Sequence, residues 1–351
     1  MAGQTNIVKK RPTANDVASR AGTSQSAVSR VFTEGASVSS ELRKRVMKAA
    51  NELGYRPNAI ARSLIRRRSG LVAVTIAPMH NPYNAELIET LTQRLQDQGY
   101  QVLLFTAPHG SSSPFLLEQV LQYQVEAVIL GSTGLTPLQA SECQLVGVPI
   151  IMFNPSLQDT NVSVVLGENE RAGETIGNFL VRGGHRRLAF MAGHEHSVGS
   201  YDRERGFTRA VLNAGLPTPL RAQGDYNIHT TASAMRTLMK RKDRPDAIFC
   251  ANDSTAIICL DVARYEFGLN IPNDLSIIGF DDMAQARLPC YDLTTYAQPV
   301  APMVDLTIGI ISDFVRDPSQ SPRRITVAGE FVIRGTARIP DGMTRQQKEL
   351  L

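Results

Sequence analysis

The sequence has no long run of apolar residues, and this absence excludes one class of protein. A membrane-spanning helix needs about 18 or more consecutive apolar residues, and no such stretch occurs in the 351 residues. The first eleven residues carry charge but no apolar centre, so they do not match a secretory signal. We therefore expect a cytoplasmic protein that makes no use of a membrane.

Cysteine is also scarce. The four cysteines, Cys143, Cys250, Cys259 and Cys290, lie far apart and form no C-x-x-C pair. Disulfide frameworks and zinc sites both need closer and more regular spacings. We expect four free thiols in a reducing compartment.

Catalytic signatures are missing. No G-x-G-x-x-G, P-loop or G-x-S-x-G motif occurs. The sequence His194-Glu195-His196 could hold a metal, but two histidines in a loop need a third ligand to fix the geometry. A loop that lines a cleft or meets solvent is the preferred interpretation. We predict no enzyme activity, no cofactor and no metal site.

Acidic residues are few in the first 70 residues. This segment holds 14 Lys and Arg side chains against only Asp16, Glu34, Glu41 and Glu52, a balance of +10. The remaining chain holds 23 basic and 29 acidic side chains, a balance of −6. A basic segment on a mildly acidic body is typical of binding to a phosphate backbone, although basic arms also bind membranes or keep tails soluble.

Three short amphipathic helices are predicted within the basic segment. Thr13 and Asp16 form a capping box at the start of the first helix, and Ser24 caps the second helix. Gly22 breaks the first helix in a tight turn, and Gly54 ends the third. The apolar faces are Val17, Ala18 and Ala21, then Val28, Val31 and Phe32, then Leu42, Val46, Ala49, Ala50 and Leu53.

Two short helices joined by a glycine turn and clamped by a third form a helix-turn-helix arrangement. Its second helix enters the major groove with its first side chains against the base edges. Gln25, Ser26, Ser29 and Arg30 point outward from the predicted helix 25–32. Glutamine can pair with adenine through two hydrogen bonds, and arginine can reach guanine or a phosphate. The alternative is a three-helix bundle whose polar face only meets water.

The segment after the bundle favours DNA binding. It reads Tyr55-Arg-Pro-Asn-Ala-Ile-Ala-Arg-Ser-Leu64 and continues into the basic linker up to Gly70. Seven residues, 58–64, are too few for a stable helix alone, so we expect this segment to order only on DNA as a pair across a dimer. Leu64 is an apolar residue at the end of a basic stretch, which is typical of a minor-groove wedge.

Residues 71 to about 340 alternate short apolar runs with helical patterns, which predicts β-α-β units around parallel sheets. The expected strands are 71–77, 100–106, 127–130, 149–153, 187–191, 247–250 and 275–280, and the expected helices are 85–98, 169–182, 200–213, 230–240 and 253–266. The elements before helix 169–182 and the elements from this helix onward form two series of similar size. We therefore predict an all-α helix-turn-helix headpiece followed by an α/β core of two doubly wound lobes with parallel sheets, facing across a cleft that can close.

The run from Arg11 to Phe32, RPTANDVASRAGTSQSAVSRVF, resembles the headpiece of the LacI/GalR repressor family, and residues 55–64 resemble the hinge helix of that family. The resemblance implies that Gln25, Ser26 and Arg30 read the major groove and that Leu64 intercalates. Ala27 departs from the family pattern, in which many members carry Thr, so a hydroxyl contact to DNA would be lost. The predicted DNA-binding residues are Thr13, Ser24, Gln25, Ser26, Ser29, Arg30, Tyr55, Asn58, Ala61 and Leu64.

The body resembles the effector-binding core of the same family, which is similar to periplasmic sugar-binding proteins, up to about Arg338. The matching motifs include Asn81-Pro-Tyr83, Gly183-Gly-His185, Ala251-Asn-Asp253 and Gly279-Phe-Asp-Asp282. The resemblance implies three crossovers between the lobes, near 167–169, 281–294 and 321–324. The predicted domains are a headpiece at 1–57, a hinge helix and linker at 58–70, a two-lobe effector-binding and dimerisation domain at 71–340, and a polar tail at 341–351.

Polar and aromatic residues follow several predicted strands, where a ligand in the cleft would contact them. Arg203 can donate a rigid fork to hydroxyls or to a carboxylate, while Asn252 and Asp281 come directly after strands. The resemblance maps effector contacts onto Tyr83, Asn84, Arg203, Tyr226, Asn252, Asp281 and Gln298. Asn252 could instead only cap the next helix, and Tyr226 could be ordinary packing. Ile258, where many relatives carry Gly, changes helix packing near the site.

Together these patterns predict a homodimeric transcriptional repressor that binds a pseudo-palindromic operator. A carbohydrate-like effector, a sugar or a sugar acid, would control the operator affinity, and a nucleobase stays open because Tyr83 could stack on one. Two other classes are a periplasmic-type solute-binding protein and a sugar-modifying enzyme on the same core. The capped headpiece disfavours the first, and the lack of a nucleophile or acid–base pair disfavours the second.

Overall fold

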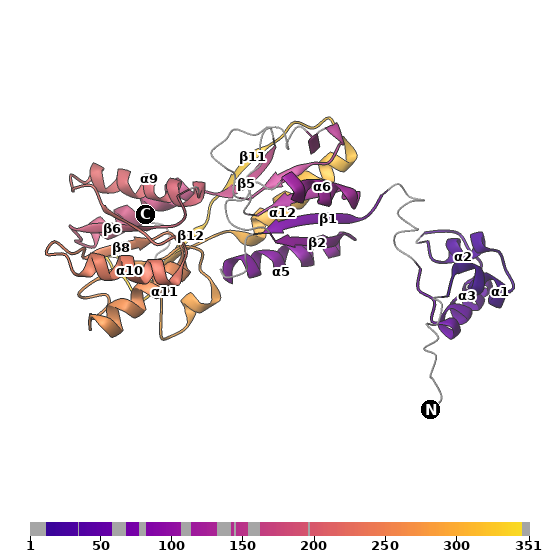
Figure 1. Ribbon diagram of the computed structural model, residues 1–351, viewed down its shortest axis with the longest axis horizontal. Coiled ribbons are helices and arrows are strands. Elements are labelled where there is room, and N and C mark those ends of the chain that lie inside the picture. The colour runs from indigo at the N-terminus through magenta and orange to yellow at the C-terminus, as the bar shows by residue number, and fades with distance from the viewer. Residues whose placement is uncertain are drawn as a thin grey trace, which may run out of the picture. The chain divides into compact units, whose positions relative to one another are not determined.

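The computed structural model describes residues 12–33, 35–57, 68–76, 82–106, 114–131, 142–143, 145–153, 162–195 and 197–345. The chain divides into two compact units, Met1–Ser69 and Gly70–Leu351. The first contains a three-helix headpiece, and the second is the α/β body (Figure 1). Among the described helices, none combines the length and the hydropathy needed to cross a bilayer.

The headpiece consists of α1 (Ala14–Ala21), α2 (Gln25–Val31) and α3 (Ser40–Leu53). The Asp16 amide donates to Thr13 Oγ1 at 3.3 Å and the Thr13 amide donates to Asp16 Oδ2 at 2.7 Å, which confirms the predicted capping box. Gly22 and Gly54 end α1 and α3 in the left-handed region, at φ 60° and 67°. The core is Val17, Ala18, Ala21, Val28, Val31, Val46, Ala49 and Ala50. Leu53, predicted to join this core, is 37% exposed because it lies on the last turn of α3.

The first lobe of the body is built on a parallel sheet in the order β11-β5-β4-β3-β1-β2. Its strands are β1 (Leu71–Ile76), β2 (Gln101–Thr106), β3 (Ala127–Leu130), β4 (Ile150–Met152), β5 (Ser163–Gly167) and β11 (Arg324–Val327). Side chains alternate between the faces, so Val72 and Val74 pack with α5 (Pro82–Asp97) and α12 (Val300–Arg316). Ala73 packs on the other face, with Val120 of α6 (Pro114–Gln122).

The second lobe has a four-stranded parallel sheet in the order β7-β6-β8-β9. The strands are β6 (Leu188–Ala192), β7 (Leu220–Gln223), β8 (Ala247–Cys250) and β9 (Ser276–Ile278). Helices α8 (Asn169–Arg182) and α9 (Val198–Asn213) pack on one face around Phe179, Phe190 and Phe207. Helices α10 (Ile228–Met239) and α11 (Asp253–Asp261) cover the opposite face (Figure 1).

The chain passes three times between the lobes. The first crossover lies at 167–169, between β5 and α8, as predicted. The other two predictions were wrong. Residues 281–294 stay in the second lobe, where Met283 and Leu293 enter its core, and the chain crosses only at 298–299, after β10 (Thr295–Ala297). The third crossover is at 328–329, because residues 324–327 form β11 of the first lobe before β12 (Glu330–Val332) pairs with β10.

The predicted fold class is confirmed, as are the bounds of strands 127–130 and 247–250 and of helix 169–182. The expected helix 253–266 is α11 continued by a π-helical turn, η1 (Val262–Glu266), and a short 3₁₀ turn, η2 (Ala284–Arg287), follows later. Helices α6 and α12 and strands β5, β7, β10, β11 and β12 were not predicted. Strand β7, for example, is a half-exposed edge with the sequence LRAQ, which has no apolar run. All four cysteines are free thiols, as expected, and only Cys290 is exposed.

Candidate functional site

Helix α2 begins with a run of exposed polar side chains. Gln25, Ser26 and Arg30 are exposed, and Ser29 is half-buried. Ser24 Oγ accepts from the Ala27 amide at 3.2 Å and lies 3.0 Å from Ser26 Oγ, so the start of the helix is capped. A capped helix end with exposed polar side chains beyond it is what a major-groove reading helix requires.

The other predicted DNA contacts fall into two groups. Thr13 and Tyr55 have structural roles, since Thr13 caps α1 and the Tyr55 ring packs edge-on against Phe32 with centroids 5.8 Å apart. Ala27 is buried, so its methyl group faces the headpiece interior. The second group, Asn58, Ala61 and Leu64, lies outside the described residues.

The carboxyl ends of the four strands of the second lobe carry several predicted effector residues. Tyr226 follows β7, His194 follows β6, Asn252 follows β8 and Asp281 follows β9. Because the strands are parallel and ordered β7-β6-β8-β9, these residues form a row along one edge of the sheet. Neighbouring strands lie about 4.8 Å apart, so the row spans roughly 14 Å.

Arg203 of α9 is buried, and three uncharged groups hold its guanidinium. Nε donates to Asn169 Oδ1 at 2.8 Å, and Nη1 donates to the carbonyl of Ala251. Cζ lies 3.5 Å from the centroid of the Phe280 ring. Within the described residues Arg203 makes no ion pair, and its Nη2 donates to no group. A buried cation without a counter-charge is unfavourable, so the site favours a ligand oxygen at Nη2.

Asn252 and Asp281 are both buried beside this arginine. Asn252 Oδ1 caps α11 by accepting from the Thr255 amide at 2.9 Å, so the capping interpretation holds for its oxygen. The Asn252 amide nitrogen makes no hydrogen bond within the described part of the chain, which leaves it for a ligand. Gln298 Nε2 donates to Asp281 Oδ1 at 2.7 Å, so the structure brings two predicted effector residues together.

The neighbouring aspartates have structural partners. Thr295 Oγ1 and the Met283 amide donate to the two carboxylate oxygens of Asp253, at 2.6 and 2.9 Å. Burial, and then the negative charge of Asp281, raises the pKa of Asp253 to about 7 against these two hydrogen bonds. Asp282 is held by ion pairs with two arginines, Arg334 at 2.6 Å and Arg287 at 3.0 Å.

The first lobe contributes Tyr83 and Asn84, on the first turn of α5. Burial raises the pKa of the Tyr83 phenol, the charge of Asp281 raises it further, and the charge of Arg203 opposes this. The Tyr83 phenol is therefore within electrostatic reach of both second-lobe residues. The structure therefore brings Tyr83 together with Arg203 and Asp281.

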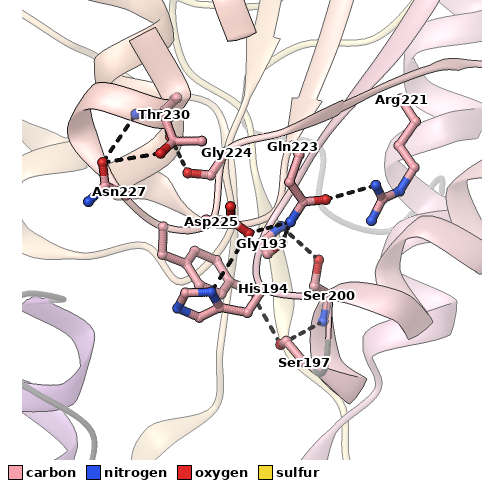
Figure 2. A network of polar contacts seen from close by, with 12 residues as sticks. Gly193, His194, Ser197, Ser200, Arg221, Gln223, Gly224, Asp225, Asn227 and Thr230 are labelled. Atoms are coloured by element: carbon pink, nitrogen blue, oxygen red, sulfur yellow. Dashed lines mark hydrogen bonds and ion pairs between the residues drawn. The ribbon is translucent and has the colours of Figure 1, made fainter. Parts of the chain in front are cut away.

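An aromatic pair, His194 and Tyr226, occupies the other end of the row, and Figure 2 shows His194 beside Asp225. The His194 and Tyr226 rings meet edge-on, with centroids 5.4 Å apart and planes at 84°. Tyr226 Oη lies 3.4 Å from Ser197 Oγ, and His194 Nδ1 lies 3.7 Å from Asp225 Oδ1. Gly193 is required here, since a Cβ at this position would lie 2.0 Å from Tyr226 Cζ.

The other interpretation of His194 was a metal ligand. No group of three His, Cys, Asp or Glu within the described residues could hold a metal ion, and His196 lies outside them. The imidazole of His194 is instead part of an aromatic wall.

Backbone strain marks both ends of the row. Asp225 and Tyr226 have φ values of 55° and 52°, and Asp281 and Asp282 have 120° and 57°. Non-glycine residues seldom adopt positive φ, and where they do so the strain is often stored at a functional site. The two strained pairs lie just after β7 and β9, the outer strands of the sheet.

Two family models match the chain. Residues 13–58 match the model of bacterial regulatory proteins of the lacI family, and residues 178–337 match a periplasmic binding protein-like domain. The chain carries a LacI-family helix-turn-helix domain and a periplasmic-binding-protein-like domain. Its homologues are DNA-binding regulators of transcription of the LacI family, and the helix-turn-helix prediction and the two-lobe core prediction are both confirmed.

Relatives of this chain align over nearly its whole length. It is 29% identical to the catabolite control protein A of Priestia megaterium, covering 88% of this chain and 96% of that protein. It is also 29% identical to the transcriptional repressor CytR of Escherichia coli, covering 94% and 98%. A transcriptional regulator CelR–cellobiose complex matches at 28% identity with a TM-score of 0.69, over 93% and 100% of the two chains. The lac repressor dimer bound to operator shares the fold, with a TM-score of 0.84 at 23% identity over 93% and 99%.

Sequence reasoning missed several residues of this site. Asn169 and Phe280, which hold Arg203, look like an ordinary helix start and strand end in the sequence. His194 was considered as a metal ligand or as part of a loop that lines a cleft or meets solvent, and not as one half of an aromatic pair. The signal that could have indicated a wall is the position of the two rings. His194 comes directly after Gly193, Tyr226 comes two residues after Gly224, and each glycine directly follows a strand.

Proposed function

We propose that this LacI-family regulator binds a pseudo-palindromic operator as a homodimer and represses transcription, with one headpiece in each half-site. The observation that carries this proposal is the capped start of α2 with Gln25, Ser26 and Arg30 exposed beyond the cap. The balance of +10 in residues 1–70 supports contact with the phosphate backbone. Matched half-sites follow because the symmetry of a dimer requires the same contacts twice.

Operator binding can be measured on a duplex enriched from a random library. Arg30→Ala or Gln25→Ala should each weaken binding by about 5- to 150-fold, the effect of losing one base contact of about 1–3 kcal/mol. Arg241→Ala is the matched control, since Arg241 is an exposed arginine of the body paired with Asp243. If no duplex is enriched over random sequence, or if affinity does not fall steeply with salt, sequence-specific binding is wrong.

We further propose that the effector is a sugar or a sugar acid bound along the row of strand ends. Arg203 Nη2, the Asn252 amide and the Asp281 carboxylate supply the mixture of donors and acceptors that hydroxyl groups satisfy. The unpaired charge of Arg203 favours an oxygen-rich or acidic group at that end. A row of roughly 14 Å has room for two sugar rings, and the CelR relative is described with cellobiose.

The wall of His194 and Tyr226 fits the opposite end of the same ligand. A pyranose has an apolar face that packs on aromatic rings, and the strained turn at 225–226 holds Tyr226 in place. A nucleobase could stack on the same rings, so it is the alternative effector class.

A thermal-shift series on the full-length protein separates these classes. Cellobiose, gluconate, ribose and adenosine are titrated separately, and a true effector raises the unfolding temperature with its concentration. A shift with cellobiose or gluconate supports the carbohydrate proposal. A rise in the unfolding temperature with adenosine alone would show that the effector class is nucleosides.

The homodimer has a candidate surface on the second lobe. Tyr265 of η1 is 81% exposed and Leu288, just after η2, is 46% exposed. Arg264 Nη1 donates to the Cys290 carbonyl at 2.6 Å, which joins the two segments that carry these side chains. Neighbouring exposed apolar side chains are typical of an interface. Sedimentation of Leu288→Asp should show dissociation toward monomer, and an unchanged dimer would exclude this surface.

We propose that the protein is not an enzyme and acts in the cytoplasm, where its operator is found. The support is the membership of a family of DNA-binding regulators. Turnover of cellobiose or gluconate by the purified protein would contradict the first part.

A further inference from the structure

Arg203 is connected to the first crossover between the lobes through one buried side chain. Asn169 Oδ1 accepts from Arg203 Nε at 2.8 Å. The amide group of Asn169 then turns back, and its Nδ2 donates to the carbonyl of Gly167 at 3.3 Å. Since Gly167 ends β5 of the first lobe and Asn169 begins α8 of the second, this bond pair spans the crossover itself.

A stack of rings connects the same guanidinium to the second crossover. Phe280 lies between Arg203, at 3.5 Å from its ring centroid, and Tyr296, whose ring is parallel within 16° at a centroid distance of 5.3 Å. Both rings are nearly fully buried. The Asp281 amide donates to the Tyr296 carbonyl at 2.9 Å, two residues before the chain crosses at Gln298.

The third crossover reaches the stack through a hydroxyl group. The Gly329 amide donates to Tyr296 Oη at 3.2 Å. Only glycine permits this approach, because a Cβ at residue 329 would lie 2.2 Å from the Ala297 carbonyl oxygen and 2.5 Å from the Tyr296 ring.

We propose that Asn169, Phe280 and Tyr296 are positioning residues that hold Arg203 and couple its guanidinium to all three crossovers. The proposal rests on the proposed function in one respect, that an effector oxygen binds Arg203 Nη2. An effector at that atom then acts on the whole set of segments that determine lobe closure, rather than on the second lobe alone. A shift of the Arg203 guanidinium on effector binding is transmitted by rigid packing, because the buried rings have no space to absorb it.

The network itself is tested by hydrogen–deuterium exchange of the full-length protein without any ligand. Arg203→Met should accelerate exchange by about threefold or more in the peptides around 167–169, 281 and 329, because it removes the hydrogen bond to Asn169 and the contact with Phe280. Tyr296→Phe keeps the ring stack and removes only the hydroxyl, so it should accelerate exchange at Gly329 and leave 167–169 unchanged. Arg236→Met, at an exposed arginine of α10 that pairs with Glu266, is the control and should change none of the three.

The pattern across the variants decides the outcome. Faster exchange in Arg203→Met confined to α9, or a uniform increase over the whole body, would overturn the coupling. An unchanged exchange rate of the Gly329 amide in Tyr296→Phe would also overturn the coupling. If Arg203→Met does not fold, Arg203→Lys, which keeps the charge but loses the planar fork, replaces it with the same expected pattern.

A second readout separates the positioning role from simple stability. With cellobiose or gluconate, whichever binds, Tyr296→Phe should keep the ligand affinity within about twofold but reduce the ligand-induced change in operator affinity by threefold or more. An undiminished change would overturn the proposal. If neither compound binds while the exchange pattern holds, the carbohydrate proposal fails and the network stands.

Discussion

The headpiece and the second lobe position their polar site residues in opposite ways. In the headpiece, Gln25, Ser26 and Arg30 lie within one short helix and are exposed, and Ser24 caps the start of this helix locally. In the second lobe, the Arg203 side chain is buried and held by groups 34 and 48 residues away in the chain.

This difference follows from what each surface binds. A reading helix meets a groove that is open before binding, so its side chains need only the correct helical spacing. A small ligand is surrounded on most sides, so its contacts must come from several strand ends and be fixed in advance. A change at one residue should therefore have local effects in the headpiece and wider effects in the lobe.

The largest expected effect is that of Arg203→Met on effector affinity. Loss of the charged donor at Nη2 should weaken binding by about 100-fold, close to 3 kcal/mol, because hydrogen bonds to charged groups are the strong ones. Isothermal titration with the sugar or sugar acid that stabilises the protein measures this. Arg205→Met should bind normally, and its operator affinity without effector should equal that of the parent. Equal losses of effector affinity in the two variants would show that Arg203 does not bind the effector.

A smaller effect is expected from pH, through Asp253. Its pKa is about 7 in the folded protein against an ordinary value of 3.8, so the folded state holds this proton more tightly than the unfolded state. The stabilisation is complete below pH 3.8 and is lost as the pH rises toward 7, which amounts to about 2 kcal/mol between pH 5 and pH 7. Chemical denaturation at these two pH values should show a shallower decrease for Asp253→Asn than for the parent. Parallel pH profiles would assign the titration elsewhere.

Gly193→Ala should have a more limited effect on the same pocket. The added methyl group collides with the Tyr226 ring, which is the movable partner, so the wall shifts while the fold remains. We expect effector affinity to fall by about tenfold and the unfolding temperature to stay within a few degrees, since one displaced aromatic contact is worth about 1 kcal/mol. Gly309→Ala, on α12 with nothing within 4 Å of the new methyl, is the control. Undisturbed ligand affinity would exclude the His194–Tyr226 wall from the site.

The smallest expected effect is on the headpiece cap. Ser24→Ala removes the hydrogen bond to the Ala27 amide and should destabilise α2 by about 1 kcal/mol. Operator affinity should fall only a few-fold, and the unfolding of the body and its effector affinity should not change. A loss of effector binding in this variant would contradict the expectation that a change in the headpiece has only local effects.

The sequence predicted the headpiece almost completely, because its determinants are local. Capping at Thr13 and Ser24, glycine at the helix ends and apolar spacing of three and four residues are all visible within 40 residues, and each was confirmed. Leu53 was the exception, because whether the last turn of a helix is covered depends on what packs against it. The polar DNA-contact residues follow from the same spacing and remain predictions.

In the body, the apolar runs were enough to predict two parallel α/β lobes. The effector contacts of Asn252 and Asp281 after strands, and of Arg203 in the helix after a strand, remain predictions. The second and third crossovers were misplaced, since local patterns do not show which sheet a short strand such as β10 or β11 joins. Only the tertiary structure decided that Asn169, Phe280, Tyr296 and Gly329 converge around one arginine. Periodicity records which side of an element is buried, whereas the pairing of distant side chains depends on packing in three dimensions.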